Sequence, residues 1–160
     1  MKIVKLCLKV RNDKRPTVIV NNSQKLFDVF NSYFDKGTIH IQESVWVCYM
    51  NTAKEVIAVQ NLANGGMSSC IIDTKLIIAT ALNLGCSCLA IAHNHPSGAN
   101  RFSQSDIDTT EKISMACSIM DMSIIDHILM FGNEYKSMAD CGELNTYSSN
   151  RIINEIKSCQ

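Results

Sequence analysis

Apolar residues recur along this chain at two spacings, and each spacing predicts one kind of secondary structure. Short runs in which apolar and polar residues alternate, or in which apolar residues are continuous, predict strands. These runs are Ile3–Val10, Ser44–Met50, Glu55–Val59, Ser68–Ile72, Cys86–Ala92, Ile124–Phe131 and Glu134–Ser137. Residues 51–54 join the second run to the third, and this short connection predicts a hairpin.

Apolar residues three and four positions apart predict three helices. The first is capped by Ser23 and stops at Gly37, the second is capped by Asp73 and covers Thr74–Leu84, and the third covers Gln104–Met120. Strands that alternate with helices in this order predict an α/β (α+β) fold, in which helices flank a mixed sheet.

The chain has 160 residues, of which 46% are hydrophobic and 19% are charged, as is typical of a globular protein. This length predicts a single domain over residues 1–160, ending in a polar and loosely held tail over 145–160. The apolar runs fall far short of the roughly 18 residues that span a bilayer. The first nine residues alternate apolar and basic side chains and do not resemble a signal peptide. We therefore expect a cytoplasmic protein without a membrane partner.

Fifteen basic and fifteen acidic residues give a formal net charge of zero, whereas a dedicated nucleic-acid binder usually carries a basic excess. One local bias occurs in the first fifteen residues, where six basic side chains against Asp13 give a charge of +5. The six are Lys2, Lys5, Lys9, Arg11, Lys14 and Arg15. Solvated strand edges and a loop over 11–16 explain this bias most simply, and contact with a phosphate or a partner is the alternative.

Two of the four histidines, His93 and His95, directly follow the apolar run 88–92. If that run is a strand, both side chains point to the same face at its end. Asp106 arrives on the next element, so two imidazoles and a carboxylate can meet there. Such a set satisfies zinc and leaves a fourth position open, which is typical of a catalytic site. Because zinc lowers the pKa of its water toward about 7, the pattern predicts metal-activated hydrolysis.

The same residues also fit structural roles. The two histidines can form hydrogen bonds in a turn before Pro96, and Ser103 with Asp106 fits a capping box at a helix start. Capping and metal binding are compatible, because a capping carboxylate keeps one oxygen for the metal. Pro96 and Gly98 break the strand, so the loop over 96–102 can bring Asp106 back to the histidines.

Hydrolysis also needs a base that takes a proton from the attacking water. Glu43 is the first candidate, because it is a polar residue at the start of the apolar run 44–50. A solvated glutamate at a strand end is the structural alternative. Glu55, at the start of the neighbouring strand, is the competing candidate, whereas Glu111 and Glu134 fit exposed surface charges.

The eight cysteines include no Cys-x-x-Cys pair, and several of them lie inside apolar runs. A free cysteine packs there as a small hydrophobic residue, so we expect reduced thiols. Cys86 and Cys88 precede the histidines on the same run, but we do not favour them as metal ligands.

Residues 41–144 resemble the RadC-like branch of the JAB/MPN metallopeptidase-like domains, preceded by a strand and a helix over 1–40. The His-x-His pair, then Ser103 and Asp106, with a glutamate upstream, matches the JAMM motif of these domains. Features similar to the RadC-like branch are the sequence AHNHPSG at 92–98, Gly65-Gly66, Asp73, Asp126-His127 and Tyr135-Lys136-Ser137.

The resemblance implies a mixed sheet wrapped by helices, similar to the fold of cytidine deaminases. It implies that zinc is held by His93, His95 and Asp106. Glu43 matches the general base of active members, and Ser103 matches the serine that helps to stabilise the oxyanion intermediate. Phe102 stands where a proline is common in the family.

Together these features predict a zinc hydrolase of JAB/MPN type that cleaves a peptide or isopeptide-like amide in a peptide or protein substrate. The alternative is a DNA-repair-associated accessory or binding protein with a structural or vestigial metal site. The cluster of basic residues near the N-terminus suggests this alternative. Base deamination is not favoured, because neither His-x-Glu nor Pro-Cys-x-x-Cys occurs. For His127 we favour a structural role, with support of a metal ligand as the alternative.

Overall fold

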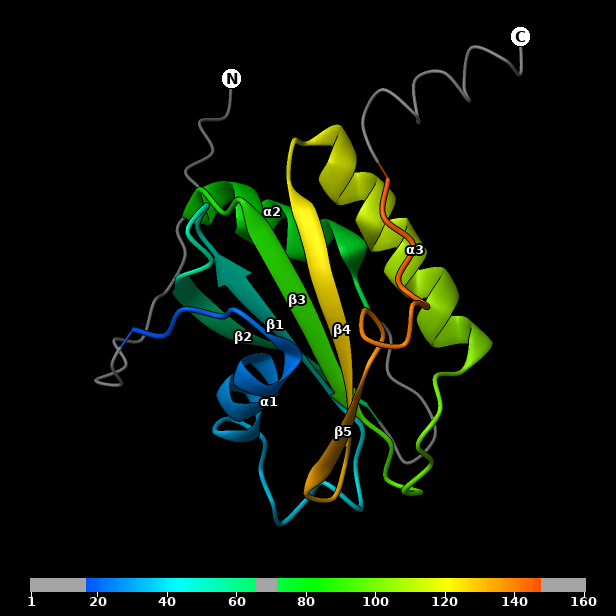
Figure 1. Ribbon diagram of the computed structural model, residues 1–160. Coiled ribbons are helices and arrows are strands. Elements are labelled where there is room, and N and C mark those ends of the chain that lie inside the picture. Colours follow the sequence, from blue (N-terminus) through cyan, green and yellow to red (C-terminus); the bar gives the residue numbers. More distant parts are fainter. Residues whose placement is uncertain (1–16, 66–71, 148–160) are drawn as a thin grey trace, which may run out of the picture.

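Five strands form one mixed sheet in the computed structural model, which describes residues 17–65 and 72–147 (Figure 1). In chain order the strands are β1 (Ser44–Met50), β2 (Val56–Asn64), β3 (Cys88–Asn94), β4 (Ser123–Phe131) and β5 (Glu134–Ser137). Across the sheet their order is β2-β1-β3-β4-β5. β3 and β4 are parallel, and the other neighbours are antiparallel. The predicted hairpin of β1 and β2 is confirmed.

Helices cover both faces of the sheet (Figure 1). They are α1 (Ser23–Asn31), α2 (Thr74–Leu84) and α3 (Gln104–Ile119). Phe30 of α1 shares one apolar cluster with Ala90 of β3, whereas Ile77 of α2 and Ile113 of α3 share a second cluster with Ile91. Neighbouring residues of β3 thus belong to different cores, because successive strand side chains point to opposite faces. The predicted α+β fold, a mixed sheet flanked by helices, is confirmed.

Three strands differ from their predicted bounds, and β4 does so only by beginning one residue earlier, at Ser123. β2 continues past its predicted end at Val59, because an edge strand accommodates polar side chains; Gln60 there accepts a hydrogen bond of 2.7 Å from the Tyr49 hydroxyl. β3 begins and ends two residues later than the predicted 86–92, since the connection from α2 occupies the first two positions. His93 therefore lies inside the strand rather than after it.

The first helix differs from its prediction at both ends. Its cap is Asn22, whose Oδ1 accepts a hydrogen bond of 2.8 Å from the Lys25 N–H, and not the serine that follows. It also ends well before position 37, because Tyr33 and Phe34 leave the helix and pack beside Trp46, with ring centroids 5.7 and 5.9 Å away. α2 has its predicted cap and bounds, and α3 ends one residue before its predicted end.

Several predictions fall outside the described residues. These are the strand over 3–10, the loop over 11–16 with the cluster of basic residues near the N-terminus, the strand over 68–72 except for Ile72, and the tail after 147. Ile72 itself and residues 145–147 belong to no helix or strand. Within 17–65 and 72–147, no helix has the length and apolar character that crossing a membrane requires.

Candidate metal centre

His93 and His95 lie at the carboxyl end of β3, the central strand of the sheet. β3 is buried along its whole length, because it has a strand on each side and helices over both faces. Since side chains alternate along a strand, the two histidines share the face covered by α3. Asn94, between them, points to the face covered by α1.

Asp106 lies in the first turn of α3, where it forms a capping box with Ser103. The N–H and the hydroxyl of Ser103 each donate a hydrogen bond of 2.7 Å to Asp106 Oδ2, and the Asp106 N–H donates to Ser103 Oγ at 3.2 Å. The predicted capping box is confirmed. Both bonds from Ser103 go to Oδ2, and the other oxygen, Oδ1, lies toward His93.

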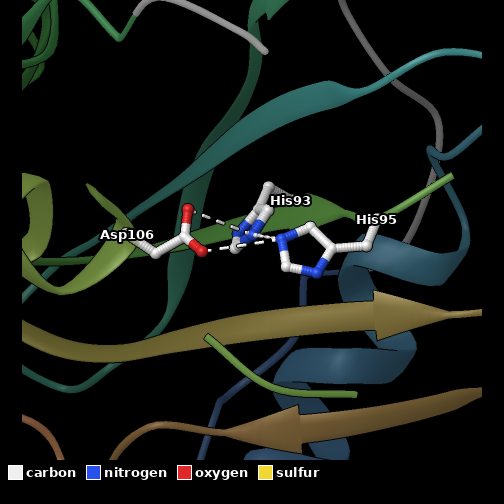
Figure 2. Close-up of side chains that lie close together, drawn as sticks. All are labelled: His93, His95 and Asp106. Carbon is white, nitrogen blue, oxygen red and sulfur yellow. Dashed lines mark hydrogen bonds and ion pairs between the residues drawn. The ribbon is translucent and has the colours of Figure 1, made fainter. Parts of the chain in front are cut away.

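The three side chains converge on one point, which Figure 2 shows. His93 Nε2 lies 3.0 Å from His95 Nε2 and 3.4 Å from Asp106 Oδ1. His95 Nε2 lies 3.5 Å from Asp106 Oδ2, and one ligand atom of each residue lies within 4.8 Å of the others. The loop between β3 and α3 turns at Gly98, whose φ of 73° suits a glycine.

The arrangement of donors and acceptors fits a divalent ion such as zinc. His95 Nδ1 lies 3.2 Å from the carbonyl oxygen of Ala99. A carbonyl only accepts, so Nδ1 of the neutral ring carries the proton and Nε2 presents its lone pair to the point of convergence. Two ring nitrogens and a carboxylate oxygen are ligands that zinc binds, and three of them leave a fourth position open.

The charges of this cluster act on one another. Burial alone raises the pKa of Asp106, but the His93 and His95 rings, whose Nε2 atoms lie 3.4 and 3.5 Å from its oxygens, hold that pKa well below its usual range. The neighbouring Asp106 carboxylate in turn raises the pKa of His95 from its ordinary value of 6.5, because it stabilises the protonated ring. The carboxylate is therefore ionised at neutral pH, which is the form that binds a cation.

Glu43 directly precedes β1 and lies beside this cluster. Burial raises its pKa from the ordinary value of 4.5, and the charges of His93, Asp106 and His95 also act on it. Its backbone carbonyl accepts a hydrogen bond of 2.9 Å from the N–H of Gly65. A partly buried carboxylate with a raised pKa is suited to taking up a proton.

Asn94 holds the backbone on both sides of Glu43. It is fully buried, and its Oδ1 accepts a hydrogen bond of 2.8 Å from the Ser44 N–H. Its Nδ2 donates to the carbonyls of Ile39 and Gln42 at 2.7 and 2.9 Å. Sequence reasoning missed this role, although a polar residue at the end of a buried strand was a signal for it.

The competing candidate Glu55 lies away from the cluster, and Glu111 and Glu134 have contacts or positions of their own. Glu55 is at the opposite end of β1 from Glu43, where its Oε2 accepts a hydrogen bond of 2.9 Å from Asn51. Glu111 accepts a hydrogen bond from Asn145, and Glu134 is exposed at the start of β5. Of these four glutamates, Glu43 is the one that the structure brings to the histidines.

The cysteines also lie apart from the histidines. Cys86 lies just before β3 and Cys88 begins the strand, and their thiols donate to the carbonyls of Cys88 and Asn51 at 3.0 and 3.7 Å. Among the described residues all cysteines are free, namely Cys48, Cys86, Cys88, Cys117 and Cys141. Cys86 and Cys88 are therefore packing residues near the end of β3 that the cluster does not occupy.

His127 of β4 lies directly behind His93 and is fully buried. Its Nε2 lies 2.7 Å from His93 Nδ1, and its Nδ1 lies 2.6 Å from Thr110 Oγ1. Burial lowers the pKa of His127 well below 6.5. Phe102 packs against both rings, with centroids 5.4 Å from His127 and 6.2 Å from His93. Neither Thr110 nor this function of Phe102 was expected from the sequence.

Asp126 has a different role from its neighbour. It accepts hydrogen bonds from the His127 N–H at 2.7 Å, the Ser137 hydroxyl at 2.6 Å and the Ala139 N–H at 3.0 Å. These bonds fix the chain that follows β5 to the middle of β4. The two neighbours thus have different roles: the Asp126 carboxylate holds the backbone after β5, and the His127 imidazole contacts His93 of the candidate centre.

The sheet is mixed, two histidines lie at the end of its central strand, and a carboxylate lies at the start of the helix that follows. This arrangement is that of a JAB-like domain with a candidate metal site. Comparison with protein families is consistent with this class. The chain belongs to the RadC-like JAB domain family, which matches residues 20–143. The match includes α1, the whole sheet and every residue of the candidate centre.

Similar proteins carry the name UPF0758 protein. The one from Flavobacterium johnsoniae is 37% identical over 100 residues, which are 62% of this chain and 44% of that protein. The one from Porphyromonas gingivalis is 36% identical over 105 residues, 64% of this chain and 46% of the relative. The one from Carboxydothermus hydrogenoformans is 35% identical over 111 residues, 69% and 49% of the two chains. The aligned part is thus about half the length of each relative.

Proposed function

We propose that this chain is a zinc-dependent hydrolase of the JAB type that cleaves a peptide or isopeptide-like amide bond. The observation that carries the proposal is the convergence of His93, His95 and Asp106, with Glu43 beside them. Membership of the RadC-like JAB domain family supports it. The substrate class, a peptide or protein, follows from this resemblance.

The residues of the centre divide the work of hydrolysis. His93 and His95 would hold the ion through Nε2, and Asp106 through Oδ1. When bound, a zinc ion makes a water molecule acidic at neutral pH and polarises an amide carbonyl. Glu43 takes the proton of the attacking water on a carboxylate oxygen and passes it to the departing amide nitrogen. Its raised pKa suits both transfers, because the carboxyl must gain and then lose the same proton.

Ser103 contributes first by orienting a ligand. Its hydroxyl donates to Asp106 Oδ2, so the carboxylate is held with Oδ1 toward His93. Stabilisation of an oxyanion by the same hydroxyl requires it to change its partner during the reaction. We include that second role in the proposal on the strength of the motif match.

Zinc analysis tests the centre itself. Protein loaded with zinc and dialysed is expected to retain one ion per chain, and His95→Ala is expected to retain none, because two ligands hold zinc weakly. His40→Ala, at an exposed histidine outside the centre, is the matched control and should bind like the wild type. Absence of stoichiometric zinc in the wild type, or equal zinc in His95→Ala, contradicts the proposal.

Peptide cleavage tests the base. A library of internally quenched peptides and isopeptides is incubated with the zinc-loaded protein. Glu43→Gln should reduce cleavage by roughly 100-fold or more while zinc stays bound, since a general base contributes about that much. Glu55→Gln removes the competing carboxylate and should leave cleavage unchanged. Equal cleavage by wild type and Glu43→Gln would exclude Glu43 as the base.

A further inference from the structure

A buried chain of hydrogen bonds connects two of the candidate metal ligands behind the centre. It runs from the backbone carbonyl of Asp106 to Thr110 Oγ1 at 2.6 Å, from there to His127 Nδ1 at 2.6 Å, and from His127 Nε2 to His93 Nδ1 at 2.7 Å. Thr110 is 1% exposed, His127 0% and His93 1%. Water therefore does not compete for these bonds, and each donor depends on the acceptor next to it.

The direction of the first bond is fixed by chemistry. A backbone carbonyl only accepts, so the hydroxyl of Thr110 donates its proton to the Asp106 carbonyl. This bond to the residue four positions earlier is a common one for threonine in a helix. A hydroxyl has a single proton, so Thr110 Oγ1 can only accept from His127. The proton between Thr110 and His127 therefore belongs to His127 Nδ1.

The proton positions on His127 and His93 follow from the same rule that each hydrogen bond has one donor and one acceptor. A neutral imidazole has one N–H, and full burial of His127 favours the neutral form. With its proton on Nδ1, His127 presents a lone pair at Nε2, which accepts from His93 Nδ1–H. The neutral ring of His93 then has a lone pair at Nε2, the nitrogen that faces His95 and Asp106.

We propose that Thr110 and His127 are positioning residues that hold His93 in the tautomer with its proton on Nδ1, so that Nε2 is kept for a divalent metal ion. The inference rests on the metal site of the proposed function and adds to it a determinant on α3. The hydroxyl of Thr110 sets the tautomer of a ring that it does not contact. The hydrogen bond from His95 to Ala99 does the same for the second histidine by a separate route.

Removal of the hydroxyl is expected to release both rings. In Thr110→Val the shape of the side chain is kept, but His127 Nδ1 loses its acceptor. The His127 ring then carries its proton on Nε2 and donates to His93 Nδ1, which moves the His93 proton to Nε2. Thr110→Ser keeps a hydroxyl at the same place and should preserve the wild-type tautomers.

The tautomers are measured directly in metal-free protein. Side-chain nitrogen NMR of ¹⁵N-labelled protein, at a pH where the histidines are neutral, distinguishes a protonated ring nitrogen from an unprotonated one. Wild type and Thr110→Ser are expected to have His93 protonated on Nδ1. Thr110→Val is expected to shift His93 toward protonation on Nε2. This readout needs neither zinc nor a substrate.

Zinc affinity, measured by competition with a coloured chelator, is the second readout. Thr110→Val should weaken zinc binding by roughly 10–100-fold, as is typical when a partner of a metal-binding histidine is lost. Thr110→Ser should bind close to the wild-type value. Thr80→Val is the matched control, because Thr80 is a buried threonine on α2, away from the histidines, and it should leave zinc affinity unchanged.

The outcomes separate this inference from the proposed function. A wild type that binds no zinc contradicts the proposed function, whereas the tautomer of His93 in metal-free wild type tests the inference by itself. His93 protonated on Nε2 in that protein overturns the inference even if no variant folds. An unchanged zinc affinity in Thr110→Val overturns it. So does a weaker affinity with an unchanged His93 tautomer, because Thr110 would then act through packing alone.

Discussion

Ser44 donates its backbone N–H to the side-chain oxygen of Asn94 over 2.8 Å, and this bond ties the strand of the candidate base to the strand of the candidate ligands. The antiparallel register of β1 and β3 pairs Val45 with His93, so Glu43 emerges beside the histidines. Asn94 then fixes the backbone on either side of Glu43. The sheet register sets the approximate position of Glu43, and the buried side-chain amide of Asn94 fixes the backbone of the residues before and after it.

Asn94→Asp should be strongly destabilising. The new carboxylate has no proton to donate, so it faces the carbonyls of Ile39 and Gln42 without hydrogen bonds, as a buried charge. We expect the free energy of unfolding in urea to fall by about 3 kcal/mol. Asn83→Asp is the control, because Asn83 is exposed on α2 and donates to the carbonyl of Ala79 in the same helix. A similar loss in both variants would show that Asn94 has no special role.

Ser103→Ala should affect stability and zinc binding together. Loss of the cap of α3 is expected to lower the free energy of unfolding by about 1 kcal/mol. The Asp106 carboxylate also loses a hydrogen bond that orients it, so zinc affinity should fall by about tenfold. Asn22→Ala removes the corresponding cap of α1 and should cost similar stability without changing zinc affinity. Equal zinc affinity in wild type and Ser103→Ala would argue against the orienting role.

The stability of the metal-free protein should decrease at alkaline pH. Burial raises the pKa of the Cys48 and Cys117 thiols from 9.0 to about 12. Above pH 9 the unfolded thiols lose their protons while the folded ones keep them, so the unfolded state binds fewer protons and stability falls as pH rises toward 12. Each thiol should contribute a slope of about 1 kcal/mol per pH unit, measured by urea unfolding.

Variants separate these thiols from other alkaline effects. Cys48→Val keeps an apolar side chain in the core and removes one titrating group, so the decline between pH 9 and 11 should become less steep. Cys141→Ala, at an exposed cysteine, should leave the slope as it is in the wild type. A slope that is the same in all three proteins would mean that the buried thiols do not control alkaline stability.

Alkylation of the native protein should distinguish the same cysteines. Iodoacetamide at neutral pH is expected to modify Cys141 rapidly, because its thiol is exposed. Cys48 and Cys117 are fully buried and should react only after unfolding in urea. Peptide mass spectrometry before and after unfolding measures both rates. Rapid labelling of Cys117 in the folded protein would contradict its place in the core between α3 and the sheet.

Much of the fold follows from short-range patterns in the sequence. α2 has its predicted bounds because Asp73 and Gly85 are strong signals for the start and end of a helix. The capping box of α3 was predictable for the same reason. The second half of β2, residues 60–64, was not predictable, because polar residues such as Gln60 gave no strand pattern, and their place on an edge strand depends on the whole sheet.

The sequence predicted the candidate ligands, but not all of the residues that support them. Spacing alone suggested that His93, His95 and Asp106 meet, and the structure brings them together. The roles of Asn94 and Thr110 depend on partners far away in sequence, at the loop before β1 and on β4. Such pairings arise from the packing of separate elements, so no local pattern announces them. The zinc chemistry itself remains a proposal.

Because side chains alternate along β3, the candidate ligands and the segment of the candidate base are held from opposite faces of the sheet. The ligands are supported from the side of α3 and β4, whereas the segment with the candidate base is tied through Asn94 to the side of α1. If the proposed function holds, changes beneath α1 would therefore move the Glu43 segment while the candidate ligands stay in place. Under the same proposal, changes in α3 would alter the position of Asp106 while the backbone around Glu43 stays in place.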